Sequence, residues 1–170
     1  MKLPVILNGS KTELEASPDT SLMSVLRKYS FSSIKCGCNE GHCGSCAILL
    51  DDEAIASCKI PFGIIKDSDI VTLDYFSRSK EYTVISQGFE LAGIKLCGYC
   101  NAGKYFTAYH IIKQGKILTK KEIENQIKNL SPCCTDLNTL VKGIIFSNEL
   151  YINGYEATKK KYQNTLRRAE

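Results

Sequence analysis

Short apolar runs alternate with turn residues over the first 76 residues. Asn8-Gly9 is a strong hairpin signal because both residues tolerate positive φ. Apolar residues recur at helical spacing after Asp19-Thr20, which can cap a helix over 21–29. Two further runs flank the Asp51-Asp52 turn. The expected strands are 3–7, 12–16, 47–50, 54–58 and 70–73. One helix among several strands predicts a small α+β domain over 1–76.

Beyond residues 74–80, apolar residues recur at the spacing of an α-helix. Asn101 can cap one helix, and Thr119-x-x-Glu122 is a capping box that opens another. The expected helices cover 82–92, 101–113, 120–128 and a segment that begins near 135. Four helices in this length predict a compact all-α bundle as a second domain over 80–156.

Composition and charge narrow the class of protein. The 170 residues are 44% hydrophobic with a net charge of +4, which suits two small packed domains. Much of the positive surplus lies in 157–170, which we interpret as a solvated basic tail, because a charge run of this kind is usually solvated and the chain has no tryptophan for base stacking. No apolar segment approaches the roughly 20 residues that span a membrane, and the first residues do not form a signal peptide. We expect a cytoplasmic or mitochondrial-matrix protein, with the cytoplasm preferred, that binds neither nucleic acid nor membrane.

Nine cysteines in a reducing compartment indicate metal binding rather than disulfides. Four of them have the C-x4-C-x2-C…C spacing of plant-type 2Fe–2S ferredoxins: Cys38, Cys43, Cys46 and Cys58. Three glycines in the same segment can take positive φ and let backbone N–H groups approach the sulfides: Gly37, Gly41 and Gly44. The sequence therefore predicts a loop that supplies three thiolates and a strand end that supplies the fourth.

Other interpretations of this segment are weaker. Structural zinc sites favour paired C-x2–4-C knuckles, and only Cys43 and Cys46 form a short pair here. His42 is interpreted as a solvated loop residue rather than a Rieske-type ligand, because four cysteines already suffice. Cys36 is interpreted as a packed thiol.

A second group of cysteines lies in the helical half. Cys97 and Cys100 stand between the first two expected helices, and Cys133 and Cys134 stand just before the fourth. Cys100 and Cys134 would each lie near a helix N-terminus, where free N–H groups and the dipole favour negative charge. The two loops could form a second four-thiolate site, although a redox-active or zinc site would give a similar pattern.

These motifs together resemble a known family. The segment Lys35–Cys46 (KCGCNEGHCGSC), the later Cys58 and the segment Leu96–Cys100 (LCGYC) resemble the small iron–sulfur subunit of molybdenum hydroxylases, which include xanthine dehydrogenase, aldehyde oxidoreductase and carbon monoxide dehydrogenase. The resemblance runs from about Leu3 to Ile145. It implies an N-terminal β-grasp ferredoxin-like domain, a C-terminal four-helix domain and two 2Fe–2S clusters, with Gly98 beside the second. It also implies partner chains that carry molybdopterin and FAD, with electrons passing from molybdenum through the helical-domain cluster to the ferredoxin-like cluster and then to flavin.

The second motif departs from the family pattern. The family writes Gln-Cys-Gly-Tyr/Phe-Cys, with a glutamine that contacts the pterin, and Leu96 occupies that position here. After Cys100 the family places 31 residues and then Cys-Arg-Cys-Thr, whereas this chain has Pro132, Cys133 and Cys134. Adjacent residues on an extended segment point to opposite faces, so Cys133 needs a sharp local bend to act as a ligand. We expect Cys133 to be the substitute ligand; a three-cysteine site with a foreign ligand, or no second cluster, are the alternatives.

Two functions follow from these motifs. The first is an electron-transfer subunit of a multi-subunit molybdenum hydroxylase, with no substrate pocket and no catalytic residue of its own, since His110, Tyr109 and the carboxylates form no acid–base or nucleophile set. The alternative is a diverged stand-alone ferredoxin-like carrier or docking protein that keeps only the N-terminal cluster. A purely structural zinc protein is a third reading, which predicts colourless material.

Overall fold

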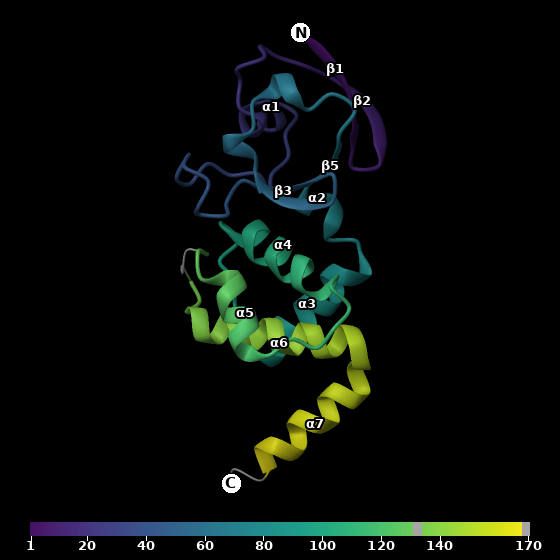
Figure 1. The fold of residues 1–170 in the computed structure, drawn as a ribbon, viewed down its shortest axis with the longest axis vertical. Coiled ribbons are helices and arrows are strands. Elements are labelled where there is room, and N and C mark those ends of the chain that lie inside the picture. The colour runs from purple at the N-terminus through teal and green to yellow at the C-terminus, as the bar shows by residue number, and fades with distance from the viewer. Residues whose placement is uncertain (131–133, 168–170) are drawn as a thin grey trace.

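A five-stranded mixed sheet with one helix beside it forms the N-terminal part of the computed structural model, which describes residues 1–130 and 134–167 (Figure 1). The strands are β1 (Lys2–Leu7), β2 (Ser10–Glu15), β3 (Ala47–Leu50), β4 (Glu53–Ala56) and β5 (Asp69–Val71). Their order is β2-β1-β5-β3-β4; β1 and β5 run parallel, and the other neighbouring pairs are antiparallel. The segment between α1 (Leu22–Lys28) and β3 carries the first cysteine motif.

Local sequence signals explain these elements. Asn8 and Gly9 have φ of 52° and 77°, the two positive values that a type I′ hairpin needs between β1 and β2. Alternate residues of β1 are buried, and they meet the apolar face of α1 in one core. Ser21 caps α1 by accepting a hydrogen bond from the Ser24 backbone N–H, one position after the expected cap. The predicted hairpin and helix are therefore confirmed, with the cap corrected.

Helices make up the rest of the described chain. They are α2 (Leu73–Phe76), α3 (Lys80–Leu91), α4 (Asn101–Ile112), α5 (Lys120–Ile127), α6 (Leu137–Asn153) and α7 (Tyr155–Arg167). The capping box at the start of α5 is present as predicted, with both Thr119 and Glu122 side chains bonded to the reciprocal backbone N–H groups.

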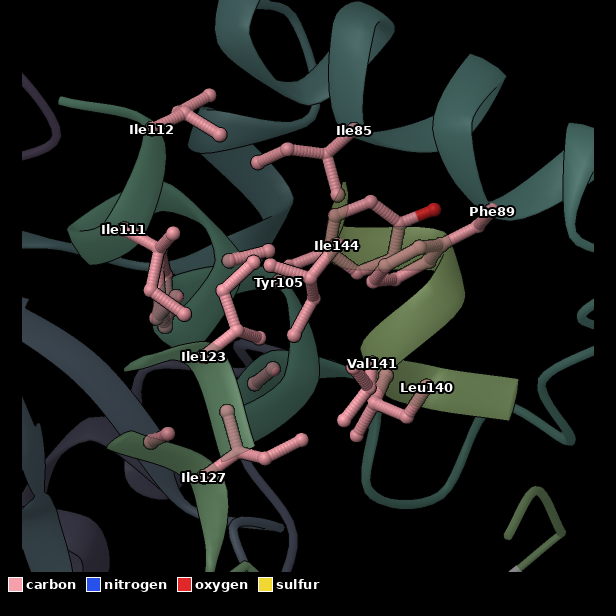
Figure 2. Packing of buried hydrophobic residues seen from close by; sticks show 14 of the residues in the cluster. Ile85, Phe89, Tyr105, Ile111, Ile112, Ile123, Ile127, Leu140, Val141 and Ile144 are labelled. Atoms are coloured by element: carbon pink, nitrogen blue, oxygen red, sulfur yellow. The ribbon is translucent and has the colours of Figure 1, made fainter. Parts of the chain in front are cut away.

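One apolar core joins α3, α4, α5 and α6. Figure 2 shows Ile123 of α5 among residues of α3 and α6 such as Ile85 and Ile144. Ala47 and Leu49 of β3 belong to the same core, so the second face of the sheet rests on α4. The sheet and the helices therefore share one packed boundary.

Three details differ from the sequence-based expectation. Cys58 lies in a short 3-10 turn, η1 (Ser57–Lys59), and not at a strand end, because β4 stops at Ala56. Cys100, not Asn101, occupies the N-cap position of α4, and its side chain makes no capping hydrogen bond. The basic segment near the C-terminus is helical: α7 packs against α6, with Thr158 2% exposed and the Lys161 amine 2.9 Å from a Glu149 carboxylate oxygen. Among the helices of the described chain, none combines the length and apolarity that crossing a bilayer requires.

Candidate metal centres

Backbone N–H groups of the first cysteine loop point at sulfur. The N–H groups of Glu40 and Cys43 donate to Cys38 Sγ at 3.3 and 3.4 Å, and the Ser45 N–H donates to Cys43 Sγ at 3.4 Å. Hydrogen bonds of this kind stabilise a thiolate more than a thiol. The loop is thus folded around its sulfur atoms as a thiolate metal site requires.

Glycines make this folding possible. A Cβ at Gly37 would lie 2.5 Å from Cys43 Sγ, so any side chain there would displace the sulfur. Gly41 and Gly44 have φ of +86° and +76°, which L-residues rarely adopt. The predicted positive φ is therefore confirmed for Gly41 and Gly44 but wrong for Gly37, where the close sulfur, and not the backbone angle, requires a glycine.

The four thiols of the first motif interact with one another. Cys38 interacts with Cys43, and Cys58 interacts with both Cys46 and Cys38. Hydrogen bonds from the backbone of Glu40 and Cys43 lower the pKa of Cys38 to about 6, whereas burial and the adjacent Cys46 raise the pKa of Cys58 to about 11. Four neighbouring thiols fit a 2Fe–2S cluster, which takes four cysteine thiolates.

The neighbours of the first loop have other partners. Cys36 Sγ donates to Asn39 Oδ1 at 3.3 Å, within its own loop. His42 is an exposed residue whose Nδ1 lies 3.7 Å from a Glu40 carboxylate oxygen.

The second cysteine group is brought together in part. The Cys97 backbone N–H donates to Cys134 Sγ at 3.4 Å, although 36 residues separate the two in sequence. Cys100 is buried at the N-terminus of α4, while Cys97 and Cys134 are exposed. Gly98, at φ +89°, turns the chain between Cys97 and Cys100, and its N–H donates to Asn101 Oδ1 at 3.1 Å. Cys133, the expected fourth ligand, and Pro132 lie outside the described residues.

Two residues beside the second cysteine group set its surroundings apart from those of the first: Leu96 and Lys104. Leu96 packs against the apolar core of the helical part. Lys104, on the first turn of α4, is 1% exposed and its Nζ donates to Cys100 Sγ at 2.7 Å. Sequence reasoning did not single out Lys104; its position four residues after Cys100 is the signal that could have found it, since residues four apart share a helix face.

The two cysteine loops touch one another. The Tyr99 hydroxyl donates to the Cys36 carbonyl oxygen at 2.7 Å, and the Lys35 amine donates to the Gly98 carbonyl oxygen. The Gly103 N–H donates to the Gly44 carbonyl oxygen at 3.0 Å. Cysteine motifs more than 50 residues apart in sequence are therefore joined by direct hydrogen bonds.

A sheet with neighbouring thiols on a glycine-bent loop defines the N-terminal part as an iron–sulfur protein. In agreement, residues 5–69 match the family described as the 2Fe-2S iron-sulfur cluster binding domain. The chain is 30% identical over 141 residues to the xanthine dehydrogenase iron-sulfur-binding subunit of Escherichia coli O157:H7, covering 82% of this chain and 89% of that one. It is also 30% identical over 118 residues to the nicotinate dehydrogenase small FeS subunit of Eubacterium barkeri, covering 69% and 75%.

A solved structure extends the likeness over most of the chain. Quinoline 2-oxidoreductase from Pseudomonas putida 86 matches with a TM-score of 0.79 and 25% identity, covering 91% of this chain and 97% of that one. The chain belongs to the small iron–sulfur subunits of the molybdenum hydroxylase family. It is the electron-transfer subunit of an oxidoreductase, and the stand-alone carrier is not favoured.

Proposed function

We propose that this chain relays single electrons within a cytoplasmic molybdenum hydroxylase, from a molybdenum centre on one partner chain to FAD or another acceptor on a second. The large partner would bind molybdopterin and the medium partner FAD. The contact between the two cysteine loops carries the proposal, because a relay needs two sites held at a fixed separation. The finer fold assignment supports it: a β-grasp ferredoxin-like domain over 1–76 and a four-helix domain over 80–156.

The first 2Fe–2S cluster would be held by the four neighbouring thiols, Cys38, Cys43, Cys46 and Cys58. When bound, it supplies one-electron redox chemistry. The chain contributes backbone N–H groups to Cys38 and Cys43, which stabilise negative charge on sulfur. Gly37, Gly41 and Gly44 give the loop its path.

A second cluster would be held by Cys97, Cys100 and Cys134, with Cys133 as the fourth ligand. The Cys97 N–H bond to Cys134 Sγ supports this set, because it draws the two loops together. Docking of the pterin against this site is expected to differ from the family pattern, because Leu96 offers no hydrogen-bonding group where the family has glutamine.

The test is iron and acid-labile sulfide quantitation of anaerobically purified protein, with low-temperature EPR after dithionite reduction. We expect about four irons per chain and two distinct signals, since each cluster holds two irons. Cys46→Ser should abolish one signal and Cys134→Ser the other, while the matched control Cys36→Ser should leave both, because Cys36 bonds to Asn39. Iron-free or zinc-containing protein would refute the proposal, and a single signal in a chain that purifies without partners would favour the one-cluster carrier.

A further inference from the structure

Lys104 is a buried cation with a sulfur atom as its partner. Its side chain is among the largest fully buried ones of the described chain, at 1% relative exposure. It begins on the first turn of α4 and reaches back along the helix, where its Nζ lies 2.7 Å from Cys100 Sγ. Side chains of a helix point towards its N-terminus, which explains how residue 104 meets residue 100.

Burial of an ammonium group is unfavourable unless a negative charge compensates it. None of the ion pairs formed within the described residues includes Lys104. The Lys104 amine instead contacts Cys100 Sγ, which would carry the compensating negative charge as a ligand of the proposed second cluster. A permanent thiolate in a buried position is what an iron ligand provides.

In the first cysteine loop the donors found among the described residues are of another kind. The hydrogen bonds to its Cys38 and Cys43 sulfurs come from backbone N–H groups, which are neutral. The two sites of one chain thus differ in the charge placed against a ligand sulfur. The reduction potential of the first cluster can therefore serve as an internal reference for the potential of the second.

We propose that Lys104 raises the reduction potential of the second cluster by stabilising its reduced form, an inference that rests on the proposed second cluster with Cys100 as a ligand. Two ferric ions, two sulfides and four thiolates together carry net negative charge, and reduction adds one electron without a change in bonds. The reduced form is thus the more negative one, and a buried ammonium bound to a ligand sulfur stabilises it more than the oxidised form. Water does not screen this charge because the amine is buried.

The test is an EPR-monitored redox titration of both clusters in the full chain, with mediator dyes as electron donors. Lys104→Met removes the charge while keeping an unbranched apolar stem. Lys104→Arg keeps the charge. Lys121→Met is the matched control, because it removes the same charge from an exposed position on α5.

We expect Lys104→Met to lower the potential of the second cluster by at least the 59 mV that corresponds to a tenfold change in a one-electron equilibrium. Lys104→Arg and Lys121→Met should change the potential of the second cluster by only a small fraction of that shift. The potential of the first cluster should stay unchanged in every variant. An unchanged second potential in Lys104→Met would overturn the inference and leave the two-cluster function intact. An equal fall in Lys104→Arg would also overturn it, because charge would not be the cause.

A measurement on the unmutated protein covers the case in which the variants do not load iron. Protein made with lysine labelled with nitrogen-15 at Nζ should show hyperfine coupling of that nitrogen to the second reduced signal in pulsed EPR, and none to the first. A second signal without lysine coupling would overturn the inference alone. Absence of any second signal would overturn both the inference and the two-cluster function.

Discussion

The contact between Gly44 and Gly103 can be tested by adding one methyl group. In Gly103→Ala the new Cβ would stand 2.7 Å from Gly44 Cα and 3.1 Å from the Gly44 carbonyl oxygen. Carbon atoms pack at about 3.5–4.0 Å, so the first cysteine loop and α4 would have to separate by about 1 Å. That movement would also strain the hydrogen bond from the Gly103 N–H to the Gly44 carbonyl oxygen.

Two destabilising terms and one stabilising term set the change in the free energy of unfolding. Overpacking costs about 1–3 kcal/mol, and weakening of one hydrogen bond costs about 0.5–1.5 kcal/mol. Replacing a helical glycine by alanine returns about 1 kcal/mol. We expect a net loss of about 2 kcal/mol, which lowers the Tm of a chain of this size by about 4–8 °C.

The assay is thermal unfolding of the iron-loaded protein, followed by far-UV circular dichroism and by bleaching of the visible absorption. Thr107→Ala is the control, because it lies on the same helix and removes side-chain atoms instead of adding them. A Gly103→Ala protein as stable as the wild type, or more stable, would show that helix propensity dominates and that the close approach is not a constraint.

Three further outcomes can be measured. Burial raises the pKa of Asp74, but hydrogen bonds from neighbouring serine side chains more than offset this and hold it below the ordinary value; Asp74→Asn should therefore lose on the order of 1 kcal/mol at neutral pH. The deficit should vanish as the pH falls below about 4, because a depressed folded pKa stabilises only above that range; a deficit independent of pH would contradict the assignment. Gly88→Ala should lower the free energy of unfolding by about 2 kcal/mol in urea titrations, because its Cβ would lie 2.5 Å from the Ser147 backbone nitrogen, and an unchanged midpoint would refute this packing. In iron-depleted protein at pH 7, iodoacetamide mapped by mass spectrometry should modify Cys38, with its pKa of about 6, well before Cys58, with its pKa of about 11, and the reverse order would refute the hydrogen-bonding pattern of the loop.

Much of the fold follows from local signals in the sequence. The Asn8-Gly9 hairpin, the Thr119 capping box and the apolar faces of the main helices each depend on a few neighbouring residues, and each is present. Helix caps were placed less well. Asp19-Thr20 and Asn101 are good capping residues, but Ser21 and Cys100 occupy the N-cap positions, since the incoming backbone direction selects the cap.

The cysteine spacing predicts a 2Fe–2S domain, which the family match supports, because three thiols lie in one short loop, where sequence separation limits distance in space. The fourth, Cys58, was expected at the end of a strand and lies in a 3-10 turn, which the Ile60 N–H closes by donating to the Ser57 carbonyl oxygen. Which thiols would interact could not be known from spacing alone.

Contacts between the two halves could not be predicted. A periodic pattern shows which face of an element is buried but not which element covers it. Tyr99 and Lys35 look like ordinary exposed loop residues in sequence. Only the folded chain brings Tyr99 to Cys36 and Lys35 to Gly98. Lys104 was missed for a related reason: a lysine within an apolar helix suggests a solvated position until the neighbouring sulfur is seen.

In the proposed relay, the glycine pair at the boundary would separate two quantities that govern electron tunnelling. Backbone atoms of Gly44 and Gly103 hold the two cysteine loops together, and would thereby set the tunnelling distance between the two clusters. The Lys104 side chain would act on the energy of the second cluster, and hence on the driving force. Variation at residue 104 would then retune the direction and reversibility of electron flow at a spacing set by the backbone.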